Sequence, residues 1–203
     1  VSSLAQIIGL SRESGVKTQI SHFKILGHKS WPNIEPALSM IEHNREEEKS
    51  DITLDFYPYE KTGSNLYLIL PSWLLEGGKE KILSELKKPA TRKSAADYLK
   101  GLTLHYDKMI IASTLRDKTS LGKNIEELSL KTGMSPEELI ISLLEINELK
   151  VSIFNEVINP AHLFLLAGKK YSLFATDGVG VSPKSVTSDL PHPRSFGAFP
   201  KCL

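Results

Sequence analysis

The sequence places a histidine and a lysine two residues apart, directly after a short β-type run. The run is Val16–Ser21, and His22 and Lys24 follow it in the stretch Ser-His-Phe-Lys. In a parallel α/β sheet the active site lies just past the carboxyl ends of the strands. A histidine there can ligate a metal ion, and a lysine two residues on can point the same way and bind an anionic group. A lone histidine near a strand end also has a purely structural interpretation.

Two further strand ends carry polar residues of a catalytic kind. Asp51–Tyr57 is predicted to be a strand that Pro58 ends, and Ser172–Thr176 is predicted to be a strand that Asp177 and Gly178 follow. If the sheet is parallel, all three strand ends meet at one rim. An aspartate before a glycine is a common turn, but an aspartate that faces a histidine-bound metal can take a proton from metal-bound water.

The segment Leu190–Leu203 adds a fourth feature, with the sequence LPHPRSFGAFPKCL. The two prolines around His192 predict a rigid loop. Arg194 could pair with a carboxylate. The alternative is a structural loop in which His192 and Arg194 bind backbone carbonyls.

These residues need an α/β scaffold, and the rest of the pattern predicts one. A helix at Ile34–Glu48 separates the first two strands, which gives the strand-helix-strand unit of a parallel sheet. Gly15 ends an earlier helix that starts at Ser3. The stretch between the second and last strands is predicted to contain a loop at Lys61–Asn65, helices at Pro71–Leu86 (interrupted at Gly77-Gly78), Ala90–Leu99, Asn124–Thr132, Pro136–Ile146 and Asn159–Leu166, and strands at Lys108–Ser113 and Val151–Val157.

Composition restricts the class of protein. The chain has 203 residues, of which 40% are hydrophobic and 24% charged, as in ordinary globular domains. A net charge of +1 gives no bulk attraction to nucleic acid or acidic membranes, so we expect neither of them as a partner. The single cysteine, Cys202, excludes an intrachain disulfide and suits a reducing cytoplasm, where we expect the protein to be located.

Taken together, these motifs resemble one family, the N-acyl-D-amino-acid deacylases or D-aminoacylases of the metal-dependent amidohydrolase superfamily. The matching segments run from His22 to Leu203 in the family's order, and the set is more specific than any one motif. The segments are Ile20–Lys24 (I-S-H-x-K), Asp55–Tyr59 (D-x-Y-P-Y), Gly63-Ser64 with Leu70–Trp73 (G-S-T-x-L and L-P-x-W), Ala175–Gly178 (S-D-G) and His192–Lys201 (H-P-R-x-(Y/F)-G-T-F-P-R).

The resemblance implies a TIM-type (β/α)₈ barrel, of which this chain would hold strands six to eight. Val16–Ser21 would be strand six, Asp51–Tyr57 strand seven and Ser172–Thr176 strand eight. Residues 1–203 would then be the C-terminal part of an amidohydrolase barrel. Residues 60–107 would form an insertion or lid over the substrate pocket.

The resemblance also implies a reaction, the zinc-dependent hydrolysis of N-acyl-D-amino acids to a carboxylate and a D-amino acid. By that similarity His22 is a zinc ligand, and Asp177 is the metal-associated general base and acid. Lys24, Tyr57 and Ser64 would hold the substrate carboxylate. Zn²⁺ would polarise the acyl carbonyl and lower the pKa of water toward ~7.

The ligand set is incomplete, which leaves alternatives open. Members of the family carry an H-x-H pair on strand one, a metal-bridging residue on strand four and a histidine on strand five, and none of these can be placed in this sequence. A zinc site needs three protein ligands, so we expect the full-length parent to be the enzyme and this piece alone to be inactive. The alternatives are a cyclic-amide amidohydrolase of the dihydroorotase or hydantoinase kind, or a non-catalytic α/β fragment. Lys24, Tyr57 and Ser64 favour an open-chain carboxylate substrate over a cyclic amide.

Overall fold

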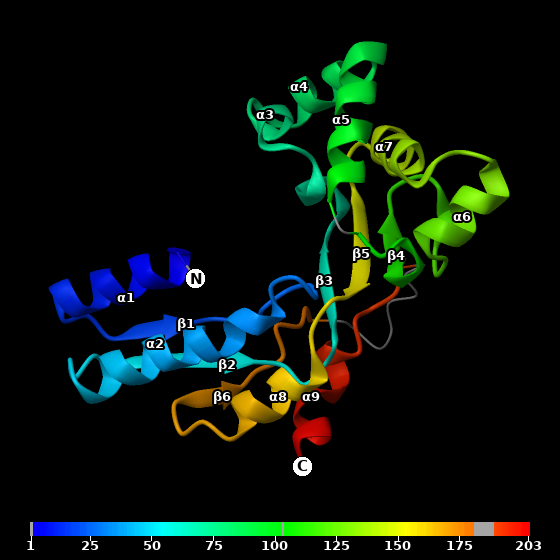
Figure 1. Ribbon diagram of the computed structural model, residues 1–203. Coiled ribbons are helices and arrows are strands. Elements are labelled where there is room, and N and C mark those ends of the chain that lie inside the picture. The colour runs from blue at the N-terminus through cyan, green and yellow to red at the C-terminus, as the bar shows by residue number, and fades with distance from the viewer. Residues whose placement is uncertain (1, 103, 181–188) are drawn as a thin grey trace. The chain divides into compact units, whose positions relative to one another are not determined.

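The computed structural model describes residues 2–102, 104–180 and 189–203, which divide into two compact units (Figure 1). The first unit consists of Val1–Lys61, Val157–Val181 and Pro193–Leu203. The second consists of Thr62–Glu156 and Ser182–His192. The chain therefore passes between the units more than once.

The first unit contains a parallel three-stranded sheet. Its strands are β1 (Thr18–Ile20), β2 (Ile52–Phe56) and β6 (Ser172–Phe174), which lie side by side in the order β1-β2-β6 (Figure 1). Ile20 pairs with Leu54, and Leu54 pairs with Ser172 on its other side. The three strands predicted from the sequence are therefore neighbours, and all run in the same direction.

Apolar periodicity explains the core of this unit. The helix α2 (Ile34–Glu46) buries Ile34, Ala37, Leu38 and Ile41, a spacing that lines one helical face. Strand β2 alternates, with Ile52, Leu54 and Phe56 buried, and these side chains join the same hydrophobic cluster. The other helices of this unit are α1 (Ser2–Ser14), the 3₁₀ turn η1 (Trp31–Asn33), α8 (Pro160–Ala167) and α9 (Arg194–Cys202).

The second unit contains a different sheet, in the order β3-β5-β4. Strands β4 (Met109–Thr114) and β5 (Val151–Glu156) are antiparallel, with an irregularity between Ile111 and Ser113. Strand β3 (Lys61–Asn65) replaces the loop predicted there, and that prediction was wrong. Thr62 is the one buried residue of β3, so the run lacks the alternating apolar side chains that identify a strand in a sequence.

Helices complete the second unit, and their buried residues share one cluster with Met109, Ile111, Val151 and Ile153 of the sheet. Ser135 caps the helix α7, because its Oγ accepts a hydrogen bond of 3.3 Å from the Glu138 N–H. The helices are α3 (Ser72–Leu75), α4 (Gly78–Leu86), α5 (Pro89–Gly101), α6 (Ile125–Thr132) and α7 (Pro136–Ile146), with 3₁₀ turns η2 (Leu66–Ile69), η3 (Tyr106–Lys108) and η4 (Lys118–Ser120).

One buried asparagine organises the turn after β4. The side chain of Asn147 is fully buried, and its Oδ1 accepts hydrogen bonds from the N–H groups of Arg116 (2.8 Å) and Asp117 (3.0 Å). Its Nδ2 donates to the Leu143 carbonyl at 2.9 Å. Three hydrogen bonds from one buried amide hold this turn against the end of α7.

The segment Leu190–Leu203 is only partly the rigid loop that its prolines predict. Residues Arg194–Cys202 form the helix α9, which continues through Pro200. The prolines on either side of His192 predicted a loop, and residues 190–193 do lie outside helix and strand. The helix that follows them was not predicted. The preceding residues are extended: the Leu190 N–H donates to the Ala112 carbonyl at 2.8 Å, and the His192 ring meets Phe154 edge-on.

The α/β class predicted from the sequence is confirmed, since the described residues contain both helices and a parallel sheet. The partial (β/α)₈ barrel stays a prediction, as does the insertion at residues 60–107. Among the described residues, every helix is too short or too polar to span a lipid bilayer.

Candidate active site

The carboxyl ends of β1, β2 and β6 meet at one edge of the first unit's sheet. Backbone pairing continues past the strands: the Phe23 N–H donates to the Asp55 carbonyl at 2.7 Å, and the Ala175 N–H donates to the Phe56 carbonyl at 2.9 Å. Because the strands are parallel, the residues that follow them share this rim.

His22 and Asp177 both have an unusual backbone conformation at this rim. Their φ angles are 43° and 45°, in the left-handed region that residues other than glycine rarely adopt. Such strain costs free energy and persists where the surrounding structure imposes it, which is common at functional sites. The His22 imidazole is exposed. Two of the residues predicted to do chemistry are thus held in strained turns directly after strands.

Asp55 holds the His22 turn in place. Its Oδ1 accepts a hydrogen bond of 2.6 Å from the His22 N–H, and its Oδ2 accepts one of 2.9 Å from Gln19 Nε2. Gln19 in turn accepts a hydrogen bond from the Thr53 hydroxyl. Sequence reasoning quoted Asp55 within a motif but gave it no role. Its position on the strand next to His22 was the available signal, and we interpret it as a positioning residue.

The buried ring of Tyr57 lies between two cations. Lys24 Nζ is 5.3 Å from the ring centroid, and the Arg194 guanidinium carbon is 4.7 Å from it. Both distances are within the range of cation–π attraction. Lys24 Nζ also donates a hydrogen bond of 2.8 Å to the His22 carbonyl. Residues from three separate segments therefore converge on one aromatic side chain.

Arg194 also forms an ion pair with Asp177. The distance from Arg194 Nη1 to Asp177 Oδ2 is 2.9 Å, and only 12% of the arginine side chain is exposed. The predicted pairing of Arg194 with a carboxylate is confirmed, and the carboxylate belongs to Asp177. Gly178 makes this approach possible, because a Cβ at that position would lie 2.8 Å from Ser195 Cα.

Burial and charge shift two pKa values in this cluster. Burial lowers the pKa of the Lys24 ammonium, while the negative charge of Asp177 opposes that shift and the positive charge of Arg194 adds to it. Burial raises the pKa of the Tyr57 hydroxyl. Tyr57 is therefore protonated at neutral pH and has a hydroxyl proton to donate.

Ser64 belongs to a different part of the structure from the other four predicted residues. His22, Lys24, Tyr57 and Asp177 lie in the first unit, whereas Ser64 is an exposed residue of β3 in the second unit. Its assignment to the substrate carboxylate stays a prediction.

The chemistry of His22 and Asp177 suits zinc, but the number of ligands does not. Imidazole nitrogen and carboxylate oxygen are both common zinc ligands, and a catalytic site uses three protein ligands. Among the described residues, no group of three or more His, Cys, Asp and Glu side chains could hold a metal ion. These residues do not form a zinc site by themselves.

Solved structures identify the fold that carries this rim. One is the N-acyl-D-glutamate deacylase from Bordetella bronchiseptica, complexed with zinc and a phosphonate inhibitor that mimics the tetrahedral intermediate of the reaction. The two sequences are 16% identical, and the TM-score is 0.67. The match covers 98% of this chain and 32% of the deacylase chain. The fold is that of part of a D-aminoacylase. The resemblance that the five motifs indicated is confirmed at the level of the fold.

A D-aminoacylase that defines a subset of amidohydrolases is also similar, with 19% identity and a TM-score of 0.65. The match covers 98% of this chain and 33% of the D-aminoacylase chain. The sequence described here therefore spans about a third of the length of these solved structures. One study of a D-aminoacylase describes a binuclear metal centre in which one metal activates and the second attenuates. No family model and no curated protein matches the sequence.

Proposed function

We propose that this chain forms part of a metal-dependent hydrolase that cleaves the amide bond of N-acyl-D-amino acids, releasing a carboxylate and a D-amino acid. One observation carries the proposal: His22, Lys24, Tyr57 and Asp177, from three separate strand ends, meet at one rim in a chain with the fold of a D-aminoacylase part. The remaining metal ligands would come from residues outside this chain. A zinc ion bound there would supply Lewis-acid polarisation of the amide carbonyl.

Lys24, Arg194 and Tyr57 form the part of the rim that suits the α-carboxylate of the substrate. The two cations face the same aromatic ring, and the Tyr57 hydroxyl is a neutral hydrogen-bond donor. A guanidinium and an ammonium together bind a carboxylate more strongly than either alone. An open-chain substrate has this free carboxylate, which favours it over a cyclic amide.

Asp177 is the proposed general base and acid. Its carboxylate is partly exposed at the rim, and one of its oxygens pairs with Arg194. A carboxylate at this place can take the proton of an attacking water and return it to the leaving amine. The ion pair with Arg194 holds one of the Asp177 oxygens in place.

The test uses the full-length protein that contains this chain, assayed on N-acyl-D-amino acids. Asp177→Asn is expected to lower kcat by about 10² to 10⁴-fold while metal content is largely kept. Lys24→Met is expected to raise KM by roughly tenfold or more, because a charge-assisted contact with the carboxylate is lost. The matched control is Lys29→Met, which removes an exposed lysine a few residues away.

Two results would contradict the proposal. Near-normal turnover in the Asp177→Asn variant would remove Asp177 from the reaction, and an unchanged KM in the Lys24→Met variant would remove Lys24 from the substrate site. If the unmodified full-length protein hydrolyses no N-acyl-D-amino acid, the non-catalytic alternative is favoured.

A further inference from the structure

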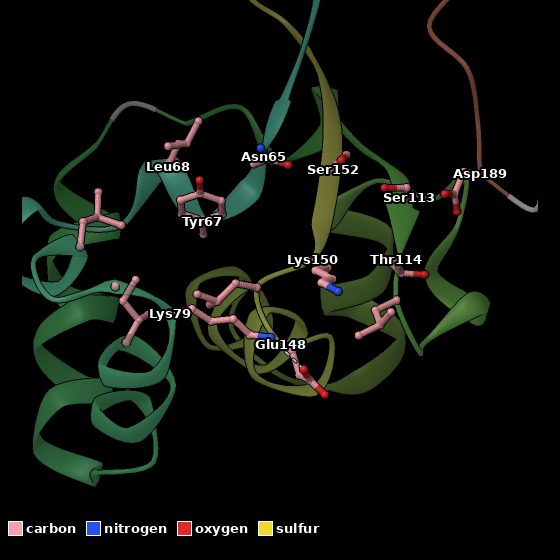
Figure 2. A pocket seen from close by; sticks show the side chains of 15 residues that line it. Asn65, Tyr67, Leu68, Lys79, Ser113, Thr114, Glu148, Lys150, Ser152 and Asp189 are labelled. Atoms are coloured by element: carbon pink, nitrogen blue, oxygen red, sulfur yellow. Dashed lines mark hydrogen bonds and ion pairs between the residues drawn. The ribbon is translucent and has the colours of Figure 1, made fainter. Parts of the chain in front are cut away.

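The second unit contains a hollow that none of the five predicted site residues lines (Figure 2). Its volume is about 750 Å³, within the range of about 300–1,000 Å³ typical of small-molecule sites. The residues that line it belong mainly to β3, η2, α3, α4, β4, β5 and the turn between α7 and β5. The hollow lies inside one compact unit, so its geometry is set by that unit alone.

Several of the residues that line the hollow are apolar. Its aliphatic side chains are Leu68, Leu75, Ile82, Leu115 and Leu149. Leu68 is 55% exposed and Leu115 is 40% exposed, whereas Ile82 and Leu149 are buried. A ligand that covered the two exposed leucines would remove apolar surface from water, which is favourable.

The three strands add a row of polar side chains. Asn65 of β3, Ser152 of β5 and Ser113 of β4 lie next to one another across the hollow (Figure 2). Ser113 and Ser152 are paired in register, which places them on the same face of the sheet. None of these three side chains forms a hydrogen bond with another described residue, so their amide and hydroxyl groups are available to a ligand.

The charged groups around the hollow favour an anion. Its two carboxylates already have cationic partners: Glu148 pairs with Lys79 at 2.9 Å, and Asp189 pairs with Lys118 at 3.3 Å. The Lys150 ammonium lines the hollow and forms no ion pair with any residue that the structure describes. Lys150 immediately precedes β5, and it lines the hollow together with Ser152 of that strand. The cation and the polar row therefore border the same hollow.

We propose that this hollow binds an organic acid with an apolar body. The carboxylate lies near Lys150 and the polar row of Asn65, Ser152 and Ser113. The hydrocarbon lies along the leucine side chains. This site is separate from the proposed hydrolysis, because none of its residues takes part in that reaction.

The test titrates the 203-residue chain with butanoate, hexanoate and octanoate by isothermal calorimetry. Affinity is expected to rise by up to about fourfold for each methylene that becomes buried. Lys150→Met is expected to weaken octanoate binding by about 1.5- to fivefold, the range for an exposed ion pair, and to leave binding of the neutral octanamide unchanged. The control Lys93→Met removes an exposed lysine of α5 outside the hollow.

A second variant tests the apolar residues. Leu68→Ser is expected to weaken octanoate and octanamide alike, because both bury their chains there. The absence of saturable octanoate binding, equal affinity for octylammonium and octanoate, or octanoate binding that neither variant changes would each overturn the proposal.

Discussion

Replacing His22 with glycine is expected to stabilise the first unit while it removes a proposed metal ligand. The His22 backbone is left-handed, with φ at 43°. Its exposed side chain forms no hydrogen bond or ion pair with another described residue. The contacts of this residue are made by its backbone, with the Asp55 carboxylate and the Lys24 ammonium. A glycine keeps those contacts and has no Cβ to be strained.

The magnitude follows from two opposing terms. A left-handed backbone destabilises the folded state of a residue with a Cβ by roughly 1–2 kcal/mol, and glycine has no such penalty. Glycine also raises the conformational entropy of the unfolded chain, which lowers the stability of the folded protein by about 0.4–1 kcal/mol. The net expectation is that His22→Gly is more stable than His22→Ala by about 0.5–1 kcal/mol. At an ordinary backbone position the sign is reversed, and alanine is the more stable residue by a similar amount.

Urea unfolding can measure this difference in one unit at a time. The chain has two tryptophans, Trp31 in the first unit and Trp73 in the second, so a Trp73→Phe background leaves Trp31 as the reporter of the first unit. Lys49 is the matched control, because it is also an exposed left-handed residue, with φ at 56°. The free energy of unfolding of the Lys49→Gly variant should exceed that of the Lys49→Ala variant by a similar amount. If alanine at position 22 is as stable as glycine while position 49 behaves as expected, the strained turn at His22 is refuted.

Two further predictions concern buried polar groups. Asn147→Ala is expected to destabilise the second unit by about 2–4 kcal/mol, because the N–H groups of Arg116 and Asp117 lose their acceptor. Trp73 fluorescence in urea measures this loss of stability, and a loss no larger than that of the exposed control Asn65→Ala would contradict the prediction. Burial lowers the pKa of His162 from 6.5, so the unfolded chain binds more protons and the first unit loses stability as pH falls below about 6.5. His162→Leu should reduce the loss of stability at low pH, whereas the control His43→Leu should leave it in place. If stability depends on pH in the same way in His162→Leu as in the unmodified chain, His162 is not the group responsible.

Much of the first unit could be predicted because its pattern is local. The buried alternation of Ile52, Leu54 and Phe56 identifies a strand, and the spacing of Ile34, Leu38 and Ile41 identifies the helix that precedes it. A strand-helix-strand unit then requires parallel pairing, which places the strand ends at one rim. The candidate residues His22, Lys24, Tyr57 and Asp177 follow from that topology together with the motif resemblance.

The rest depends on contacts between distant segments. Strand β3 is held by pairing with β5, which lies about 90 residues later in the chain, and its own residues carry no apolar pattern. The ion pair of Arg194 with Asp177 needs the close approach that Gly178 permits, and sequence spacing does not reveal it. Asp55 was missed for a similar reason, because its partner is a backbone N–H in a neighbouring segment.

The passage of the chain between the two units has a consequence for synthesis on the ribosome. Thr62–Glu156, the main part of the second unit, is continuous, whereas the first unit's sheet pairs Leu54 with Ser172. At a synthesis rate of about 5–20 residues per second, the interval between the synthesis of β2 and that of β6 is on the order of ten seconds. The second unit can begin to fold during that interval, while one edge of β2 has no partner and is open to wrong pairing. Asp177 and Arg194 both follow β6 in the sequence, so the rim is completed only after β6 has been made.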